Sequence, residues 1–278
     1  METVITLEEM RSARSKLPRP VGLVPTMGYL HEGHLSLVRR ARAENASVVV
    51  SIFVNPTQFG PHEDFESYPR DLNRDLNYLQ TEGVDLVWTP TPEVMYPEPY
   101  QTWVTVERVS RRLEGEFRPN HFRGVATVVA KLFNAVQPHR AYFGQKDAQQ
   151  ALVIRRMALD LNFPIEVIVC PTVREADGLA MSSRNTYLSP QERQAATVIY
   201  RALVAAQQAF EAGERDAERL KGVARQVIES EPLASLQYLS CANPETLEEL
   251  QGPINHALLS TAVLIGRTRL IDNVLIGG

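Results

Sequence analysis

Cysteine is scarce in this chain of 278 residues. The two cysteines, Cys170 and Cys241, are too few for a disulfide framework and too far apart for the C-x-x-C spacing of a zinc or redox site. We therefore expect neither a disulfide-rich secreted domain nor a zinc-binding domain. A cytoplasmic location fits this cysteine usage best.

Long hydrophobic runs are missing as well. No stretch approaches the roughly 18–20 apolar residues that a membrane-spanning helix needs. Glu2, Glu8 and Glu9 stand near the N-terminus, where a signal peptide would be basic and then apolar. We expect no secretion and no membrane insertion.

Neither sign of charge is in large excess. Lys and Arg number 29 against 33 Asp and Glu, which gives a formal net charge of −4. Without an extended basic block, the chain lacks the electrostatic footprint of a nucleic-acid-binding protein. We expect small molecules and further copies of the chain as partners, and no nucleic acid.

Apolar runs of strand length alternate with helix-length periodic stretches through the first two thirds of the chain. The predicted strands are 21–25, 47–54, 84–88, 141–143 and 165–170, and the predicted helices are 34–43, 70–82, 127–136 and 148–161. Near-continuous Val, Ile, Leu and Phe runs are typical of parallel strands buried on both faces. The pattern predicts a doubly wound, Rossmann-like α/β domain over residues 1–176.

Four prolines fall between positions 90 and 99, which predicts an extended loop, either a connector or a functional one. The pattern then changes near 175–188. Ser189, Pro190 and Glu192 predict a helix start, with a helix to about 212 and a second over about 216–230. Strands are predicted at 236–241, 262–266 and 268–271. We expect a smaller C-terminal α+β domain over residues 177–278.

The segment VGLVPTMGYLHEGH at 21–34 is the most informative. It predicts a buried strand, a glycine-containing turn and a helix start, whose unpaired N–H groups form an anion site. His31 and His34 would lie beside bound phosphates and donate to their oxygens, and Gly33 would allow close approach of a nucleotide. For a single histidine, capping of the helix is the competing interpretation. No G-x-G-x-x-G or P-loop motif accompanies the strand, so neither dinucleotide oxidoreduction nor P-loop hydrolysis is supported.

Three further segments carry polar side chains after strands or at the expected domain boundary. VNPTQFG at 54–60 offers neutral amides that suit a hydroxy acid, although a simple turn is an equal alternative. FGQKDAQQ at 143–150 places Lys146 where a cation can reach phosphate, against the alternative of a surface ion pair with Asp147. MSSR at 181–184 resembles the mobile K-M-S-K-S loop of class I tRNA synthetases, and Gly178 precedes it as a hinge candidate.

The H-x-G-H pattern resembles the nucleotidylyltransferase and class I tRNA-synthetase superfamily. Together, several blocks resemble one family, the pantothenate synthetases (pantoate–β-alanine ligases). These blocks are PTMGYLHEGH, VNPTQF, YPR at 68–70, HFRGV at 121–125, FGQKD, DGLAMSSRN and, near the end, RLIDN at 269–273. The resemblance covers nearly the whole chain.

The resemblance implies ATP-dependent ligation of pantoate to β-alanine through pantoyl adenylate, with release of pyrophosphate and AMP. It implies catalytic roles for His34, the proton donor, and for His31 and Lys146, and pantoate binding by Gln58 and Gln150. Gln58 also serves β-alanine. The implied ATP-binding residues are Met27, Gly28, Tyr29, Leu30, His31, Glu32, Gly33, His34, Gly144, Gln145, Lys146, Asp147, Val173, Met181, Ser182, Ser183 and Arg184.

Mg²⁺ is the implied cofactor, carried with ATP, and the resemblance implies a homodimer. Asp75 is the one candidate for a protein contact to the metal, because the acidic run that some members have after Y-P-R is not present here. Gln145 replaces a Glu of many members, so a role that needs negative charge there is absent.

Three alternatives remain open. A nucleotidylyltransferase with a phosphate-bearing acceptor would need further cations near Asn55 and Gln58. A nucleotide sensor would not need His34, Lys146 and the 182–184 donors. An RNA-binding role is weakened by the net charge of −4.

Overall fold

In the computed structural model of the chain, which describes residues 1–61 and 63–277, the chain forms two compact units. The first comprises Met1–Gln145 and Gln149–Pro171, and the second comprises Lys146–Ala148 and Thr172–Gly278. The short segment around Lys146 therefore groups with the C-terminal part of the chain, although it lies between two elements of the first unit.

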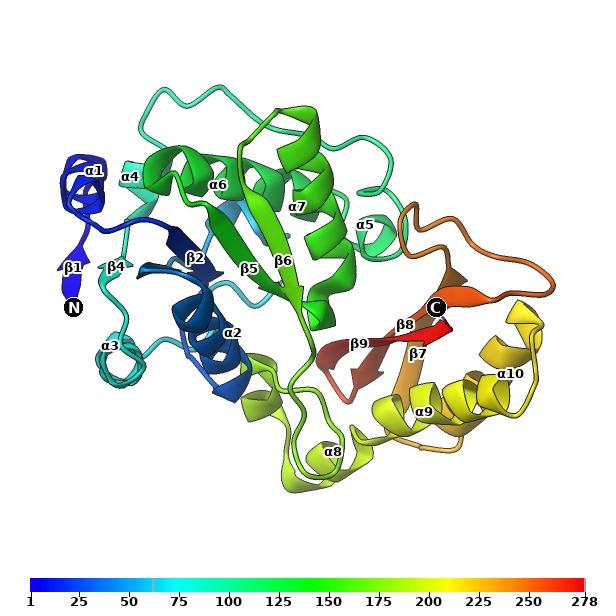
Figure 1. Cartoon of the computed structure of the whole chain (residues 1–278). Helices are drawn as coiled ribbons and strands as arrows, with labels where there is room; N and C mark the ends of the chain where they lie inside the picture. Colours follow the sequence, from blue (N-terminus) through cyan, green and yellow to red (C-terminus); the bar gives the residue numbers. More distant parts are fainter. Residues whose placement is uncertain (62, 278) are drawn as a thin grey trace. The chain divides into compact units, whose positions relative to one another are not determined.

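A six-stranded sheet forms the centre of the first unit, and every paired strand in it is parallel (Figure 1). The strand order is β1-β4-β3-β2-β5-β6. The strands are β1 (Glu2–Val4), β2 (Val21–Thr26), β3 (Ser47–Ile52), β4 (Leu86–Trp88), β5 (Arg140–Gly144) and β6 (Glu166–Cys170). The predicted doubly wound fold is confirmed, and the order reverses between β2 and β5, where such folds bind ligands.

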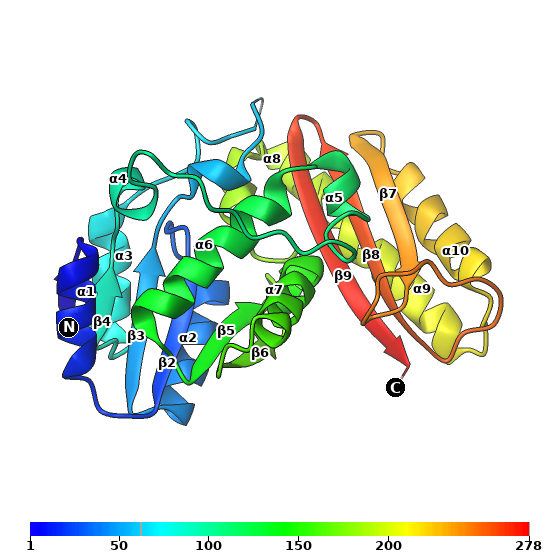
Figure 2. The ribbon, with the colours of Figure 1, turned by 90° about the horizontal axis from the view of Figure 1, so that it is seen from above.

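Helices cover both faces of this sheet, with α2 and α3 on one side and α1, α6 and α7 on the other (Figures 1 and 2). The helices are α1 (Leu7–Ser15), α2 (Glu32–Glu44), α3 (Leu72–Thr81), α4 (Pro92–Met95), α5 (Glu114–Phe117), α6 (His121–Val136) and α7 (Ala148–Asp160). Under α2 and α3, side chains such as Val24, Val38, Val48 and Leu79 are fully buried in one apolar cluster. This packing fixes the start of α2 at the carboxyl end of β2.

The sequence interpretation missed β1 and α1 and misjudged the proline-rich segment. Thr6 and Glu9 form a capping box at the start of α1, a signal that is readable in the sequence. The segment predicted as extended contains one helical turn, α4, because Thr91 caps it and Pro92 occupies its first position. Helix α6 begins six residues earlier than predicted, at His121.

The second unit contains an antiparallel sheet in the order β7-β8-β9, with α9 and α10 packed on one face (Figure 2). Its elements are α8 (Pro190–Ala195), α9 (Val198–Glu211), α10 (Ala217–Glu229), β7 (Ala234–Ala242), β8 (His256–Ile265) and β9 (Thr268–Gly277). The predicted α+β architecture is confirmed. Strands β8 and β9 are longer than predicted, because each continues along its antiparallel partner.

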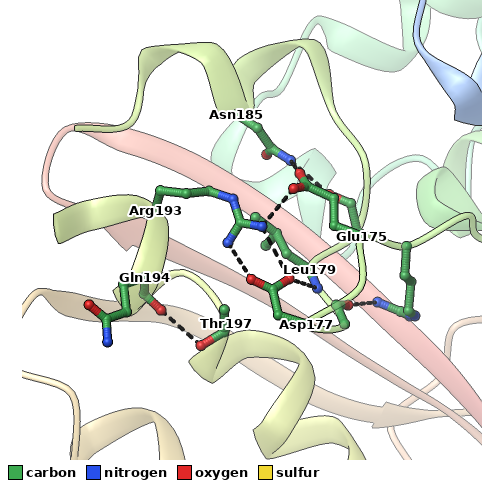
Figure 3. A network of polar contacts seen from close by, with 10 residues as sticks. Glu175, Asp177, Leu179, Asn185, Arg193, Gln194 and Thr197 are labelled. Carbon is green, nitrogen blue, oxygen red and sulfur yellow. Dashed lines mark hydrogen bonds and ion pairs between the residues drawn. The ribbon is translucent and has the colours of Figure 1, made fainter. Parts of the chain in front are cut away.

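The single helix predicted from residue 190 to about 212 is wrong, because α8 and α9 are separate. At the break, the Thr197 hydroxyl donates a hydrogen bond of 2.8 Å to the Gln194 carbonyl, as Figure 3 shows. A threonine side chain that binds a nearby carbonyl competes with the regular helical pattern.

In the described part of the chain, no helix combines the length and the apolar character that crossing a bilayer requires.

Candidate active site

The four motif-bearing segments follow four strands that are neighbours in the sheet, β3, β2, β5 and β6. Met27 and Gln58 lie after β2 and β3, and Gly144 ends β5. In open α/β sheets, ligands bind outside the carboxyl ends of the strands at the point where the strand order reverses. Within the first unit, the segments around Met27, Gln58 and Gly144 are therefore grouped at the β2/β5 switch point by the topology itself.

The turn between β2 and α2 contains two successive residues with left-handed backbone, Gly28 at φ +83° and Tyr29 at φ +50°. The Thr26 hydroxyl accepts a hydrogen bond of 3.2 Å from the Gly28 N–H and donates one of 2.8 Å to the Ser51 carbonyl. A Cβ on Gly28 would lie 3.0 Å from Ile52 Cγ2. Glycine is thus required at position 28 both by its backbone angle and by the close neighbour.

His31 and His34 cap the helix that carries them. His31 is the N-cap residue of α2, and its Nδ1 accepts the Gly33 N–H at 3.1 Å. His34 Nδ1 in turn accepts the His31 N–H at 3.4 Å, and the ring centroids lie 4.1 Å apart. Because both Nδ1 atoms accept, the proton of each neutral ring is carried on Nε2. The two rings therefore share one tautomer, with Nε2–H as the donor.

Gln58 ends a 3-10 turn, η1 (Pro56–Gln58), and its amide is oriented by neighbours within the first unit. Asn55 Nδ2 donates to Gln58 Oε1 at 3.1 Å, and Gln58 Nε2 lies 3.2 Å from Met27 Sδ. The structure thus brings together Met27 and Gln58, which are 31 residues apart in the chain. Asn55 is buried and bound to Gln58, Thr57 and Tyr96, so its contacts hold the η1 turn and the Gln58 amide in place.

The HFRGV motif supports the same turn from the side of α6. His121 Nδ1 donates to the Gln58 carbonyl at 2.9 Å, and Arg118 Nη1 donates to His121 Nε2 at 3.3 Å. A Cβ on Gly124 would lie 2.4 Å from the Thr57 carbonyl oxygen, so only glycine lets α6 approach this closely. Sequence reasoning recognised the motif but assigned these residues no function.

A partly buried ion pair completes this support. Arg118 lies 2.6 Å from Glu63 and also donates to the Gln58 carbonyl at 3.3 Å. Burial and the Arg118 guanidinium lower the pKa of His121 to about 4. His121 is therefore neutral at pH 7, in agreement with its accepting a hydrogen bond from Arg118.

Gln150 lies in the first turn of α7 and is partly buried. Its neighbour Gln149, which sequence reasoning did not select, is buried and donates to the carbonyls of Val109 and Arg112 at 2.8 and 2.7 Å. Gln149 thus anchors the long loop before α5. Beside Gly144, apart from its own chain neighbours, no described atom lies within 4 Å of where a Cβ would stand, so space is open for a ligand.

In the second unit, Lys146 lies in a 3-10 turn, η2 (Gln145–Asp147). Its Nζ is 3.5 Å from Asp147 Oδ1, and its carbonyl accepts a hydrogen bond of 2.9 Å from Asn273 Nδ2 on β9. The partly exposed contact to Asp147 is too long to hold the ammonium firmly. Asn273 belongs to the RLIDN block, whose contribution could not be read from the sequence.

The segment from Val173 to Arg184 is folded back on itself, with the Met181 N–H bound to the Val173 carbonyl at 3.0 Å. Ser182 caps η3 (Ser183–Tyr187) by accepting the Arg184 N–H at 3.3 Å. Gly178 has φ +93°, and a Cβ there would lie 2.1 Å from the Tyr200 ring. Glycine at position 178 is therefore needed so that the chain can pack against the Tyr200 ring. The sequence suggests only that Gly178 could act as a hinge.

An ion-pair network holds the turn that precedes MSSR. Figure 3 shows Arg193, on α8, between Glu175 and Asp177, at 2.6 and 2.8 Å. Asn185 donates to Glu175 from the other side at 3.0 Å. Sequence reasoning assigned Arg193 no catalytic role. Its contacts with Glu175 and Asp177 hold the turn that precedes Ser182 and Arg184.

Asp75, the residue expected to contact Mg²⁺, is bound to the backbone of the turn between β2 and α2. Both oxygens of the buried Asp75 accept backbone N–H groups, from Tyr29 at 2.7 Å and from Leu30 at 2.8 Å. Among residues 1–61 and 63–277, no three His, Cys, Asp or Glu side chains gather closely enough to hold a metal ion. The described residues do not form a protein cage for Mg²⁺.

Comparison with known proteins gives a consistent result. The family described as Pantoate-beta-alanine ligase matches residues 1–275. A pantothenate synthetase of Roseiflexus castenholzii is 61% identical over 276 residues, which is 99% of both chains.

Two solved structures extend the likeness to the fold. A pantothenate synthetase from Thermus thermophilus has 51% identity and a TM-score of 0.96, with full coverage of both chains. A pantoate-beta-alanine ligase from Francisella tularensis, in complex with β,γ-ATP and β-alanine, has 35% identity and a TM-score of 0.81, over 99% of this chain and 97% of that one. The chain belongs to the pantoate–beta-alanine ligase family.

Proposed function

We propose that this protein ligates pantoate to β-alanine in two steps, with the residues of the four segments in the roles described below. Membership of the family makes it an ATP-dependent ligase. The observation that supports the assignment of residues is the pair of histidines that cap the start of α2. Their Nδ1 atoms accept backbone N–H groups, so Nε2 carries the proton of each neutral ring and is the donor that we propose for phosphate oxygens.

In the first step, a pantoate carboxylate oxygen attacks the α-phosphorus of ATP. The bond to the oxygen that bridges to the β-phosphate breaks, and pyrophosphate leaves with that oxygen and its electrons. His34 donates to the phosphate oxygens on which negative charge develops, and Lys146 stabilises the departing pyrophosphate. His31 assists as a second donor.

The other ATP contacts are proposed from the same segments. In the first unit they come from the turn at 27–34 and from Gly144 and Gln145, and in the second unit from Lys146, Asp147, Val173 and the residues 181–184.

Pantoate binding is assigned to Gln58 and Gln150. Asn55 Nδ2 donates to the side-chain Oε1 of Gln58, which orients the amide so that its NH₂ is the donating group. A neutral donor can bind both a hydroxyl and a carboxylate without neutralising the nucleophile that must attack phosphorus. Gln58 also contacts β-alanine in the second step.

In the second step, the uncharged amine of β-alanine attacks the acyl carbon of pantoyl adenylate. The C–N bond forms, the bond to the AMP oxygen breaks, and the amine loses a proton. The products are pantothenate and AMP.

Mg²⁺ is proposed to arrive with ATP and to be held by phosphate oxygens and water, which is its usual coordination. No step depends on a metal held by the protein. A cytoplasmic homodimer that binds no nucleic acid is the assembly we propose, and sedimentation of the purified protein would give its mass in solution.

The test of this function is pyrophosphate release from ATP, measured with pantoate alone and with pantoate plus β-alanine. We expect release limited to about one equivalent of enzyme with pantoate alone and continuous turnover with both substrates. Positional exchange of ¹⁸O within ATP should occur with pantoate alone, because adenylation does not need the amine. Acid-quenched samples taken with pantoate alone should also contain pantoyl adenylate, a readout that does not require bound pyrophosphate to rotate. Turnover with neither exchange nor pantoyl adenylate would contradict the two-step order.

A phosphate-bearing acceptor in place of pantoate tests the nucleotidylyltransferase alternative. Release of pyrophosphate with that acceptor, and none with pantoate, would overturn the proposed substrate.

A further inference from the structure

The turn at 27–31 adopts a backbone that its own sequence does not favour. Gly28 and Tyr29 are both left-handed, and Tyr29 has a bulky side chain for which this region is unfavourable. The neighbouring N–H groups of Tyr29 and Leu30 lie near the end of a buried strand, where an unpaired donor is costly. The turn therefore needs partners outside itself.

Asp75 supplies both acceptors. It lies in the first turn of α3, and its side chain is 1% exposed. Its Oδ2 accepts the Tyr29 N–H at 2.7 Å, and its Oδ1 accepts the Leu30 N–H at 2.8 Å. One carboxylate thus satisfies two successive backbone donors with short, charge-assisted hydrogen bonds.

Arg74, the preceding residue of α3, holds the same turn through complementary contacts. Its Nη2 donates to the Leu30 carbonyl at 2.6 Å, and its guanidinium lies 4.5 Å from the centroid of the Tyr29 ring. Helix α3 therefore binds both the donors and the acceptor of residues 29–30. The next residue in the chain is His31, the N-cap of α2.

We propose that Asp75 is a positioning residue for adenylation, which fixes the turn at 28–30 so that His31 and His34 are presented to the α-phosphate in one geometry. The inference rests on the proposed function and deepens it. It also gives Asp75 a task different from metal binding, since both of its oxygens are already engaged by N–H groups.

The discriminating variant is Asp75→Asn. It has the same size and keeps one acceptor oxygen, but its NH₂ group faces a backbone N–H, so one of the two hydrogen bonds is lost. The matched control is Asp71→Asn on the same helix. Asp71 is the exposed N-cap that accepts the Arg74 N–H at 3.1 Å, and Asn caps a helix about as well as Asp.

Three quantities are measured for the wild type and for both variants. These are kcat and KM for ATP in pantoate-dependent pyrophosphate release, amide hydrogen exchange at Tyr29 and Leu30, and the Mg²⁺ concentration that gives half-maximal rate. For Asp75→Asn we expect kcat to fall about 10- to 100-fold, because a displacement of about 1 Å can cost that much. Amide exchange at Tyr29 and Leu30 should accelerate. The KM for ATP should rise by a smaller factor than that by which kcat falls, and the Mg²⁺ concentration for half-maximal rate should not change. Asp71→Asn should match the wild type in all three.

Two results would overturn the proposal. One is wild-type kcat together with unchanged exchange at Tyr29 and Leu30. The other is a raised Mg²⁺ requirement with unchanged exchange, which would make Asp75 a metal ligand. If Asp75→Asn does not fold, Arg74→Gln is the second variant, because it loosens the turn from its partly exposed side. It should show the same pattern with a smaller loss of kcat. Unchanged amide exchange and unchanged kcat in Arg74→Gln would reject the positioning role of α3.

Failure of the proposed function would be recognised separately. A wild-type protein that releases no pyrophosphate with pantoate would reject the ligation. Exchange at Tyr29 and Leu30, and the affinity for α,β-methylene-ATP by calorimetry, would still report whether Asp75 holds the nucleotide-binding turn.

Discussion

His31 and His34 combine a structural and a chemical task, and the structural one explains the chemical one. The Nδ1 atom of each ring accepts a backbone N–H at the start of α2, which fixes the tautomer of the ring with the proton on Nε2. The sequence identified both histidines by their place after a strand and a turn. It posed capping and catalysis as alternatives, whereas the structure shows capping by both rings, which is compatible with catalysis.

Replacing His34 or Lys146 by alanine should remove most of the activity and leave the fold intact. A lost donor to developing charge costs about 2.7–4 kcal/mol, or about 10²–10³ in kcat. The lost cap contact of His34 costs about 1 kcal/mol in stability, which a domain of ordinary stability tolerates. Steady-state kinetics and thermal unfolding measure the two effects separately.

The matched controls are His256→Ala and Lys16→Ala, two exposed positions outside the proposed site. Either active-site variant with native stability and more than about a tenth of the wild-type kcat, a loss of only ~1.4 kcal/mol, would contradict its assigned role.

His121 should make stability depend on pH. Its pKa is lowered to about 4 in the folded protein, against about 6.5 for an unfolded chain. Between these pH values the histidine is protonated in the unfolded chain but neutral in the folded protein. The contribution of His121 to the free energy of unfolding is therefore complete above pH 6.5 and declines as the pH falls towards 4. Denaturant unfolding at several pH values measures it.

His121→Gln should flatten this part of the pH dependence, and His256→Gln should not. A pH profile that is the same for His121→Gln and wild type would show that the imidazole titrates normally in the fold.

Among the elements, α6 shows where packing overrides helix propensity. Gly124 lies in the helix interior, where alanine is favoured by about 1 kcal/mol. Its absent Cβ is what allows η1 to approach, since a Cβ would lie 2.4 Å from the Thr57 carbonyl and 2.7 Å from the Gln58 N. Overpacking against backbone costs about 1–3 kcal/mol, so the packing effect outweighs propensity.

Gly124→Ala should therefore destabilise the protein and raise the KM for pantoate, because the clash displaces Gln58. Gly222→Ala in α10 is the matched control, since no described atom outside its own helix backbone lies within 4 Å of the added Cβ. That control should gain about 0.5–1 kcal/mol of stability without any change in KM. Two variants with the same sign of stability change would refute the argument.

Element boundaries show the limits of reading periodicity. The strands at 21–26 and 166–170 were predicted to within a residue, because their short apolar runs are limited by proline: Pro20 precedes the first, and Pro171 follows the second. The α8/α9 break was missed because it depends on one side-chain hydrogen bond, from Thr197 to Gln194, and not on the pattern of hydrophobicity. The start of α6 was missed because its first turns bury Gly124 beside Phe122 and Val125 without an amphipathic pattern.

At the scale of the whole molecule, the proposed ATP contacts are divided between the two units. The turn at 27–34 belongs to the first, whereas Lys146 and residues 181–184 belong to the second. A ligand that binds both units favours the arrangement in which both sets of contacts are made. Saturation with a non-hydrolysable ATP analogue should therefore narrow the distribution of distances between the units and shorten its mean. During catalysis, the same closure would protect the adenylate from water.

Spin labels at Lys16→Cys and Arg225→Cys report this distance, because both positions are exposed and the native Cys170 and Cys241 are buried. Pantoate alone is the control ligand and should leave the distribution unchanged. The same distribution with and without saturating analogue would reject closure. Ser182→Ala and Arg184→Ala should raise the KM for ATP and lower kcat together, and an effect on KM alone would limit these residues to ground-state binding.

The sequence by itself determined the α/β class, the position of the nucleotide turn and the family resemblance. Those properties depend on local patterns: apolar runs of strand length, a glycine-containing turn and motifs of adjacent residues. The tertiary structure alone decided which distant residues support those motifs. Three such sets of contacts join residues that are 45 to 127 positions apart in the sequence. They are those of Asp75 with the turn at 28–30, of His121 and Arg118 with Gln58, and of Asn273 with Lys146. Such pairings follow from sheet order and helix packing, which bring distant segments together by burial and leave no periodic trace in the chain.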